Sequence, residues 1–135
     1  MKCIRGYTRR VTWEINLHPE VEKWFLALAQ DAPEIANQVA AAIDMLAEDG
    51  PSLSRPMADR IKASRHHHMK ELRPRTSSGT EIRLLFAFDP ERQALVLVAG
   101  DKHGNWKRWY AENIPIADAR FDEHLSTLQP KGKKS

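Results

Sequence analysis

The feature that most limits how this chain can fold is the apolar run at residues 95–99, which contains no polar position. Such a run needs cover on both of its sides, so it predicts an interior strand of a sheet that is packed between other layers. A turn at residues 89–91, Asp-Pro-Glu, separates it from a second predicted strand at residues 80–88. The two strands together predict a hairpin that the rest of the chain must cover.

Arg83 is the one basic residue inside the strand predicted at residues 80–88. Apolar residues occupy every second position of that strand, so they share one face and Arg83 lies on the other face. A polar turn at residues 76–79 joins this strand to a further one at residues 69–73. Arg73 and Arg83 are therefore expected on neighbouring strands of one sheet.

Proline residues and regularly spaced apolar residues mark the helices. Pro19, Pro33 and Pro115 each stand where an apolar stripe of helical spacing begins, and Gly50-Pro51 ends the second stripe. Residues 52–65 are expected to cross from the second helix to the sheet. The chain is therefore predicted to be α+β, with a small antiparallel-rich β-sheet, an N-terminal helical hairpin packed on it and a C-terminal helix. In chain order the predicted elements are a strand at 10–16, helices at 19–31 and 33–50, strands at 69–73, 80–88 and 93–100, and a helix at 115–128.

Length and charge narrow the class of protein. The 135 residues predict a single domain over residues 1–135, with a core at about 10–128 and a disordered tail at 129–135. The one cysteine, Cys3, excludes an internal disulfide. No apolar run is long enough to span a membrane and no secretory signal is apparent, so a cytoplasmic protein without a membrane partner is expected. The net charge of +3 permits a polyanionic partner.

Three consecutive histidines, residues 66–68, raise the question of a metal site. On a strand only His66 and His68 would share a side, and a further ligand such as His103 would be needed. A polar edge strand is the favoured interpretation, so no metal and no cofactor are predicted. On such an edge, His68 would face the same cleft as the basic residues.

The two strand arginines, Arg73 and Arg83, have two open interpretations. Paired guanidinium groups suit bidentate binding of phosphate and stabilise charge that develops on phosphoryl oxygens. Alternatively they pair with Glu71 or Glu81, as surface arginines in a sheet commonly do. The spacing alone favours neither interpretation.

The segment at residues 100–110 combines cations with aromatic rings. Cations hold a phosphate backbone and aromatic faces stack on unpaired bases, so the segment suits single-stranded nucleic acid. Alternatively its aromatic residues form a short helix that faces the core while Lys107 and Arg108 are solvated; this is favoured for Trp109. No nucleotide-binding glycine loop, nucleophile elbow or carboxylate pair is present. The functional candidates here are Lys102, His103, Trp106, Lys107, Arg108 and Tyr110.

Short motifs in the expected order resemble the RelE/HigB-like superfamily of bacterial type II toxins, in particular its phage-derived Gp49-like branch. They are Glu71-Leu72-Arg73, then Gly79 followed by residues 82–89, then the apolar strand that ends in Gly100 and Lys102. The resemblance covers about residues 10–128. It implies a metal-independent endoribonuclease that cuts messenger RNA, usually at the ribosome. It also implies a cognate antitoxin, usually one with a helix-turn-helix domain.

The same resemblance implies roles for individual residues. Arg73 and Arg83 match the strand arginines, Lys102 matches the cation after the last strand, and Tyr110 matches a C-terminal tyrosine. Two positions depart from the pattern: Lys70 replaces a frequent aromatic residue, and Glu71 stands where ribosome-dependent members carry lysine. The predicted catalytic residues are Arg73, Arg83, Lys102, His103 and Tyr110, and the predicted RNA-binding residues are His68, Lys70, Trp106, Lys107 and Arg108. The alternatives are a non-catalytic ParE-like inhibitor of DNA gyrase and an inactive phage-derived protein of the same fold.

Overall fold

A five-stranded sheet forms the centre of the computed structural model, which describes residues 13–76 and 79–128. The strands lie in the order β1-β5-β4-β3-β2, and only the pairing of β1 with β5 is parallel. The α+β architecture predicted from the sequence is confirmed. Cys3 and the predicted tail at 129–135 lie outside the described residues, as do the first residues of the predicted N-terminal strand. The strands are β1 (Glu14–Leu17), β2 (Ala58–Arg60), β3 (Lys70–Leu72), β4 (Ile82–Phe88) and β5 (Gln93–Asp101).

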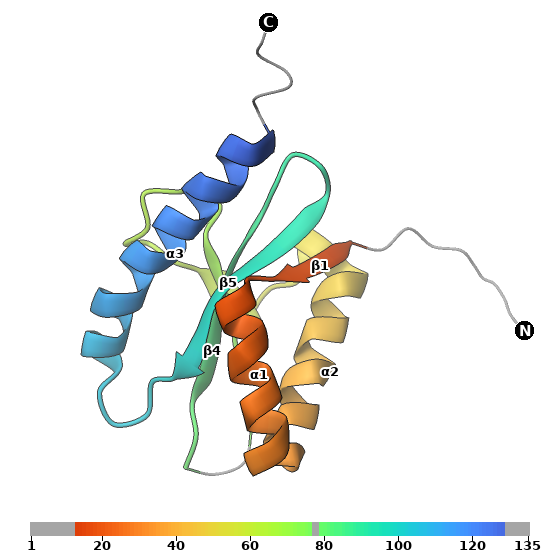
Figure 1. The fold of residues 1–135 in the computed structure, drawn as a ribbon, viewed down its shortest axis with the longest axis vertical. Helices are drawn as coiled ribbons and strands as arrows, with labels where there is room; N and C mark the ends of the chain where they lie inside the picture. Colours follow the sequence, from red (N-terminus) through yellow and green to blue (C-terminus); the bar gives the residue numbers. More distant parts are fainter. Residues whose placement is uncertain (1–12, 77–78, 129–135) are drawn as a thin grey trace, which may run out of the picture.

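Helices cover both faces of this sheet (Figure 1). Helices α1 (Pro19–Asp31) and α2 (Pro33–Asp49) form the predicted hairpin on one face, and α3 (Trp106–Leu128) lies on the other. Strand β5 lies between β1 and β4 and is buried from Ala94 to Val98, so its prediction as an interior strand is confirmed. A single turn of 3-10 helix, η1 (Gly50–Ser52), follows α2.

The alternation of side chains in β4 separates two apolar cores. Leu84 and Phe86 pack with residues of α1 and α2, whereas Leu85 and Ala87 pack with residues of α3. This is the arrangement that the spacing of two in the strand predicts. Because Arg83 has the same parity as Leu85, its side chain belongs to the α3 face.

Local signals explain where the first two helices begin and end. Each begins with a proline, and His18 caps α1 by accepting a hydrogen bond from the Glu20 N–H at 3.1 Å. Gly50 ends α2 with a φ of 58°, a conformation that glycine adopts without strain. A Cβ at Gly50 would lie 2.3 Å from Nε1 of Trp13, so the glycine also lets the residue before β1 pack on the end of α2.

Three features differ from the sequence-based predictions. The crossing segment at 52–65 contains the short edge strand β2, and the histidines at 66–68 lie in a loop, so their prediction as an edge strand is wrong. That loop is held away from the sheet because His66 and Arg65 bond to Asp122 on α3. Helix α3 begins at Trp106 and has Pro115 in its interior. One apolar stripe continues across this proline, and its packing outweighs the single backbone hydrogen bond that proline removes.

Candidate functional site

The register of β3 and β4 brings the two strand arginines together. Leu72 pairs with Leu84, so the next position on β3 places Arg73 beside Arg83. A hydrogen bond of 2.7 Å from the Arg73 N–H to the carbonyl of Met57 holds the backbone there. Both side chains lie on the face of the sheet that α3 covers.

A buried carboxylate, that of Glu71, joins the members of this site. Its side chain is 4% exposed, and Oε2 accepts a hydrogen bond of 2.8 Å from Nε of Arg73. Oε1 accepts a hydrogen bond of 2.5 Å from the Tyr110 hydroxyl and lies 3.9 Å from Nε of Arg83. The arginines are therefore both neighbours of each other and partners of Glu71, so the two interpretations of the sequence coexist.

One donor of Arg83 makes no hydrogen bond within the described residues, although it lies 3.9 Å from the Glu71 carboxylate. Its Nη1 donates to the Ile82 carbonyl at 2.8 Å, but Nε is buried and has no hydrogen-bond partner among the described residues. A buried unpaired donor costs about 1–3 kcal/mol, and such groups mark places where a ligand or an ordered molecule supplies the partner. The donor lies beside the Glu71 carboxylate, at the centre of the site.

Electrostatics fix the protonation states of two groups that bond to Glu71. Burial raises the pKa of Tyr110 above its ordinary value, the hydrogen bond to Glu71 and its negative charge raise it further, and nearby Arg83 opposes them only in part. The phenol therefore keeps its proton at neutral pH. Burial lowers the pKa of Arg73, but its hydrogen bond and ion pair with Glu71 outweigh this, and the pKa is raised.

Lys102 completes the group from the end of β5. Its side chain is 15% exposed, Nζ lies 3.2 Å from Oε1 of Glu81, and Nζ also lies 5.8 Å from the centre of the Tyr110 ring. Tyr110 thus contacts Glu71 through its hydroxyl and Lys102 through its face. We call these five residues the arginine cluster: Glu71, Arg73, Arg83, Lys102 and Tyr110.

The aromatic residues at the start of α3 point in two directions, toward the core and toward solvent. Trp109 packs against β5, where a Cβ at Gly100 would lie 2.8 Å from its Nε1, as the core interpretation expects. Trp106 is 53% exposed, and its ring centre lies 6.4 Å from that of Tyr110. Lys107 lies over the Trp106 ring at 5.6 Å, whereas Arg108 pairs with Glu112 on the surface at 3.0 Å. An exposed ring and cation therefore adjoin the cluster.

Three other predicted residues lie apart from the cluster. Lys70 points to the opposite face of the sheet, where Nζ lies 3.4 Å from the Pro51 carbonyl and 5.9 Å from the centre of the Phe88 ring. His68 and His103 are exposed in loops. Among the described residues, no hydrogen bond or ion pair links either histidine side chain to the arginine cluster.

Two acidic residues of the site were not among the predicted site residues. Glu71 was considered only as an ion-pair partner, although its spacing of two from Arg73 on a strand places both on one face. Asp59 accepts from Arg73 at 3.3 Å and from Arg55 at 3.1 Å. The N–H of Arg60 and these arginines lower the pKa of Asp59, although burial opposes them. Nothing in the local sequence connects residue 59 to residue 73.

The described residues contain neither a candidate metal site nor a candidate membrane span. No group of three or more His, Cys, Asp or Glu side chains there could hold a metal ion, and none of the described helices has the length and apolar character to span a membrane. His66 bonds to Asp122 at 2.8 Å and packs edge-on against Phe121, so this histidine fixes its loop to α3.

Comparison with known proteins identifies the class. The chain belongs to the phage-derived Gp49-like family, "Phage derived protein Gp49-like (DUF891)", whose model matches residues 23–122, so the family resemblance found in the sequence is confirmed. It is 55% identical to "Putative toxin HigB3" of Mycobacterium tuberculosis over 113 residues, which are 84% of this chain and 94% of that protein. It is also 43% identical to "Putative toxin HigB2" of the same organism over 127 residues, which are 92% of this chain and 61% of that protein. No solved structure gave a significant match.

Proposed function

We propose that this protein is the toxin of a type II toxin–antitoxin system and that it is a metal-independent endoribonuclease that cleaves messenger RNA at the ribosome. The names of the two mycobacterial relatives support the toxin assignment. The observation that carries the ribonuclease assignment is Nε of Arg83, a buried cationic donor that makes no hydrogen bond among the described residues and lies beside a second arginine. Such a pair suits a phosphate that gains negative charge during reaction.

The proposed reaction is an internal transesterification. The 2′-oxygen of the RNA forms a bond to the adjacent phosphorus, the bond from phosphorus to the 5′-oxygen breaks, and a cyclic phosphate remains. One proton leaves the 2′-hydroxyl and one is delivered to the departing 5′-oxygen. Arg73 and Arg83 would bind the phosphate and stabilise the charge on its oxygens in the transition state.

Tyr110 is the best-placed proton donor for the leaving oxygen. Its raised pKa keeps the phenol protonated at neutral pH, and its hydroxyl lies beside both arginine partners of Glu71. We assign the other proton transfer, from the 2′-hydroxyl, to Lys102, which lies over the same ring, or to His103, the next residue, whose exposed side chain would have to turn toward the cluster. Glu71 would hold the arginines and the phenol in place before the phosphate arrives.

Residues around the cluster would hold the rest of the substrate. Trp106 offers an exposed ring for a base, and Lys107 and Arg108 offer cations for the RNA strand or the ribosomal surface. An uncontrolled ribonuclease harms its host, so we also propose a cognate antitoxin, of the helix-turn-helix type by family resemblance, that covers or distorts the arginine cluster.

Substitution of Arg83 by alanine tests this proposal. We expect growth arrest to disappear and RNA cleavage to fall by about 100-fold or more, because loss of one preorganised donor has this size of effect. Arg83→Lys keeps the charge without the planar fork and should give an intermediate rate. Lys23→Ala removes an exposed cation from α1 and serves as the control. The measurement maps new RNA 5′ ends in cells and follows protein and DNA synthesis, with circular dichroism to check the fold.

The alternatives give different results in the same experiment. If DNA synthesis stops first and no new RNA ends appear, a ParE-like inhibitor of DNA gyrase replaces the ribonuclease. If wild type causes no growth arrest, the protein is an inactive member of the fold. If Arg83→Ala folds and cleaves like wild type, the ribonuclease has another catalytic centre.

A further inference from the structure

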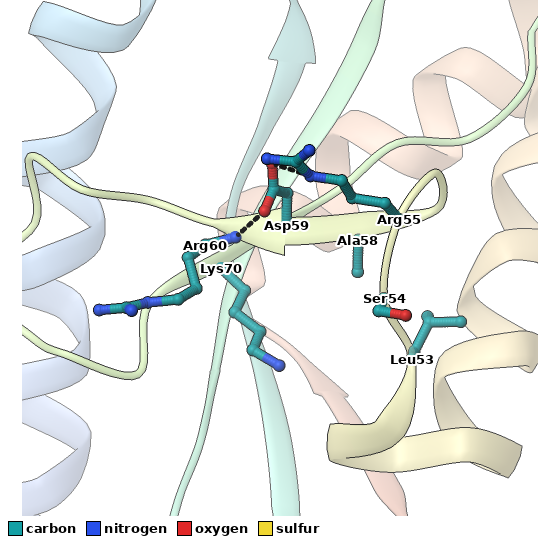
Figure 2. Close-up of a pocket in the computed structure, with 7 residues that line it drawn as sticks. All are labelled: Leu53, Ser54, Arg55, Ala58, Asp59, Arg60 and Lys70. Carbon is teal, nitrogen blue, oxygen red and sulfur yellow. Dashed lines mark hydrogen bonds and ion pairs between the residues drawn. The ribbon is translucent and has the colours of Figure 1, made fainter.

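A second basic site lies at the outer edge of the sheet, on the face opposite to the arginine cluster. A groove of about 420 Å³ lies along β2. Figure 2 shows the side chains that line it, among them Arg55, Asp59, Arg60 and Lys70. Strand β2 is the last strand of the sheet, so one of its edges carries no partner strand. The groove therefore combines an open strand edge with three cations and one carboxylate.

Two of these cations, Arg60 and Lys70, start from paired positions on neighbouring strands, and their charged ends point in different directions (Figure 2). In the antiparallel register Arg60 is the partner of Lys70, so both side chains project from the same face. In the part of the chain that the structure describes, no carboxylate lies within ion-pair distance of either residue. Both charges are therefore open to an anion from outside the protein.

The one carboxylate of the groove, Asp59, does not neutralise this pair. It lies on the other face of β2 and accepts hydrogen bonds from Arg55 at 3.1 Å and Arg73 at 3.3 Å. From Arg60 it receives only the backbone N–H, at 2.9 Å, and the Arg60 side chain extends away from it (Figure 2). Asp59 therefore connects the edge of the groove to Arg73 and leaves Arg60 and Lys70 with uncompensated charge.

This connection makes the groove continuous with the arginine cluster. Strands β4 and β2 are separated by β3 alone, so their backbones are about 10 Å apart. Arg83, Arg73 and Arg55 succeed one another across that distance, linked through Glu71 and Asp59. A polyanionic strand that runs from the cluster toward β2 would therefore pass these three arginines in turn.

We propose that the groove binds the phosphate backbone of the same RNA strand whose scissile phosphate lies in the arginine cluster, with Arg60 and Lys70 each contacting that backbone. This inference rests on the proposed function. The strand bends around the edge of β2 and is held on both faces of the sheet. Continuity with the cluster favours an RNA strand over an acidic protein segment, because the cations lie along one path that leads away from the cluster.

Binding of non-cleavable RNA tests this site on the full chain. The probes are a 2′-O-methyl dinucleotide and a longer single-stranded 2′-O-methyl oligonucleotide, which lack the attacking hydroxyl, with fluorescence anisotropy measured over a series of salt concentrations. Arg60→Ala removes an exposed guanidinium, and Arg60→Lys keeps the charge. Lys23→Ala on α1 is the matched control, since it removes an exposed cation on another element. Circular dichroism checks that each variant folds.

For the longer oligonucleotide, Arg60→Ala should lower affinity by about twofold to fivefold, the size expected for an exposed charge pair. The slope of log affinity against log salt should fall by about 0.7, which is the value for one phosphate contact on a single strand. Arg60→Lys should restore most of the slope. The loss should be smaller for the dinucleotide, which cannot reach from the cluster to the groove.

Two results would overturn the site while the proposed function stands. One is an unchanged salt slope for Arg60→Ala when wild type still cleaves RNA in cells. The other is that Arg60→Ala loses binding to poly-glutamate but binds RNA as wild type does. That result would assign the groove to an acidic peptide partner. If wild type neither binds the oligonucleotide nor produces RNA cuts in cells, both the site and the proposed function fail.

Discussion

The two faces of the sheet are built from the same strands but bury different kinds of side chain. On the face under α1 and α2, the largest fully buried residues of the sheet are apolar, such as Leu84 and Phe86. On the face under α3, apolar residues share the interior with the buried carboxylates of Glu71, Asp89 and Asp118. Each of these carboxylates bonds to another element of the fold. One face is therefore packed for stability, and the other combines packing with fixed charge.

This difference shows which face of the sheet can hold reactive groups in fixed positions. A charged group that is buried and hydrogen-bonded has a defined position, whereas one in water does not. The α3 face supplies such groups at the end near Trp106, and the α1/α2 face supplies the stable base on which they are held. We can test the contrast with three changes, taken from the largest effect to the smallest.

The largest effect is expected on the apolar face. Phe86→Ala removes a ring that is 1% exposed and should lower the free energy of unfolding by about 3–5 kcal/mol, because a cavity remains in the core. The exposed Leu26→Ala on α1 should have little effect. Chemical denaturation measures both. A loss for Phe86→Ala no larger than that for Leu26→Ala would contradict the assignment of this face to stability.

A smaller effect is expected at the buried carboxylate of the other face. Glu71→Gln removes the charge that Arg73 pairs with and should lower the free energy of unfolding by about 1–3 kcal/mol. Glu112→Gln in the exposed pair with Arg108 should change it by less than about 0.5 kcal/mol. If the two variants unfold at the same denaturant concentration, Glu71 does not organise the cluster.

The smallest effect is a pH dependence at Tyr110. Its pKa is raised above the ordinary 10.0, so the folded state holds the phenolic proton more tightly than the unfolded chain does. The stability that this contributes is present below pH 10 and is lost as pH rises further through the folded pKa. The difference in unfolding free energy between wild type and Tyr110→Phe should therefore be constant up to pH 10 and then shrink. A difference that stays constant at higher pH would contradict the linkage.

Much of the fold could be predicted because its signals are local. Pro19 and Pro33 mark the first residues of α1 and α2, and the apolar run at 95–99 marks an interior strand. Strand β2 was missed because Ala58, Asp59 and Arg60 show no alternation of their own; the hydrogen bonds of β3 make them a strand. The start of α3 was predicted at Pro115 because proline is a strong helix-start signal. The helix instead begins at Trp106, because the packing of its apolar stripe continues across the proline.

The candidate site was predictable only where strand pairing follows from a short turn. Arg73 and Arg83 are joined through a turn of a few residues, so their proximity could be predicted. The bond from Tyr110 to Glu71 could not, because it depends on how α3 crosses the sheet. Lys70 was grouped with the cluster, although alternation along β3 places it on the face opposite to Glu71. The prediction that these residues are catalytic or bind RNA awaits the experiments above.

The parallel pairing of β1 with β5 also sets an order of events during synthesis. Glu14 pairs with Gln93, so β1 lacks this pairing until β5 has emerged from the ribosome. The arginine cluster needs Tyr110 from the helix that follows. A partly synthesised chain therefore has neither the complete sheet nor the complete cluster. Long-range strand pairing of this kind is also slow to form. Under the proposed function, RNA cleavage is therefore not possible before α3 has been made.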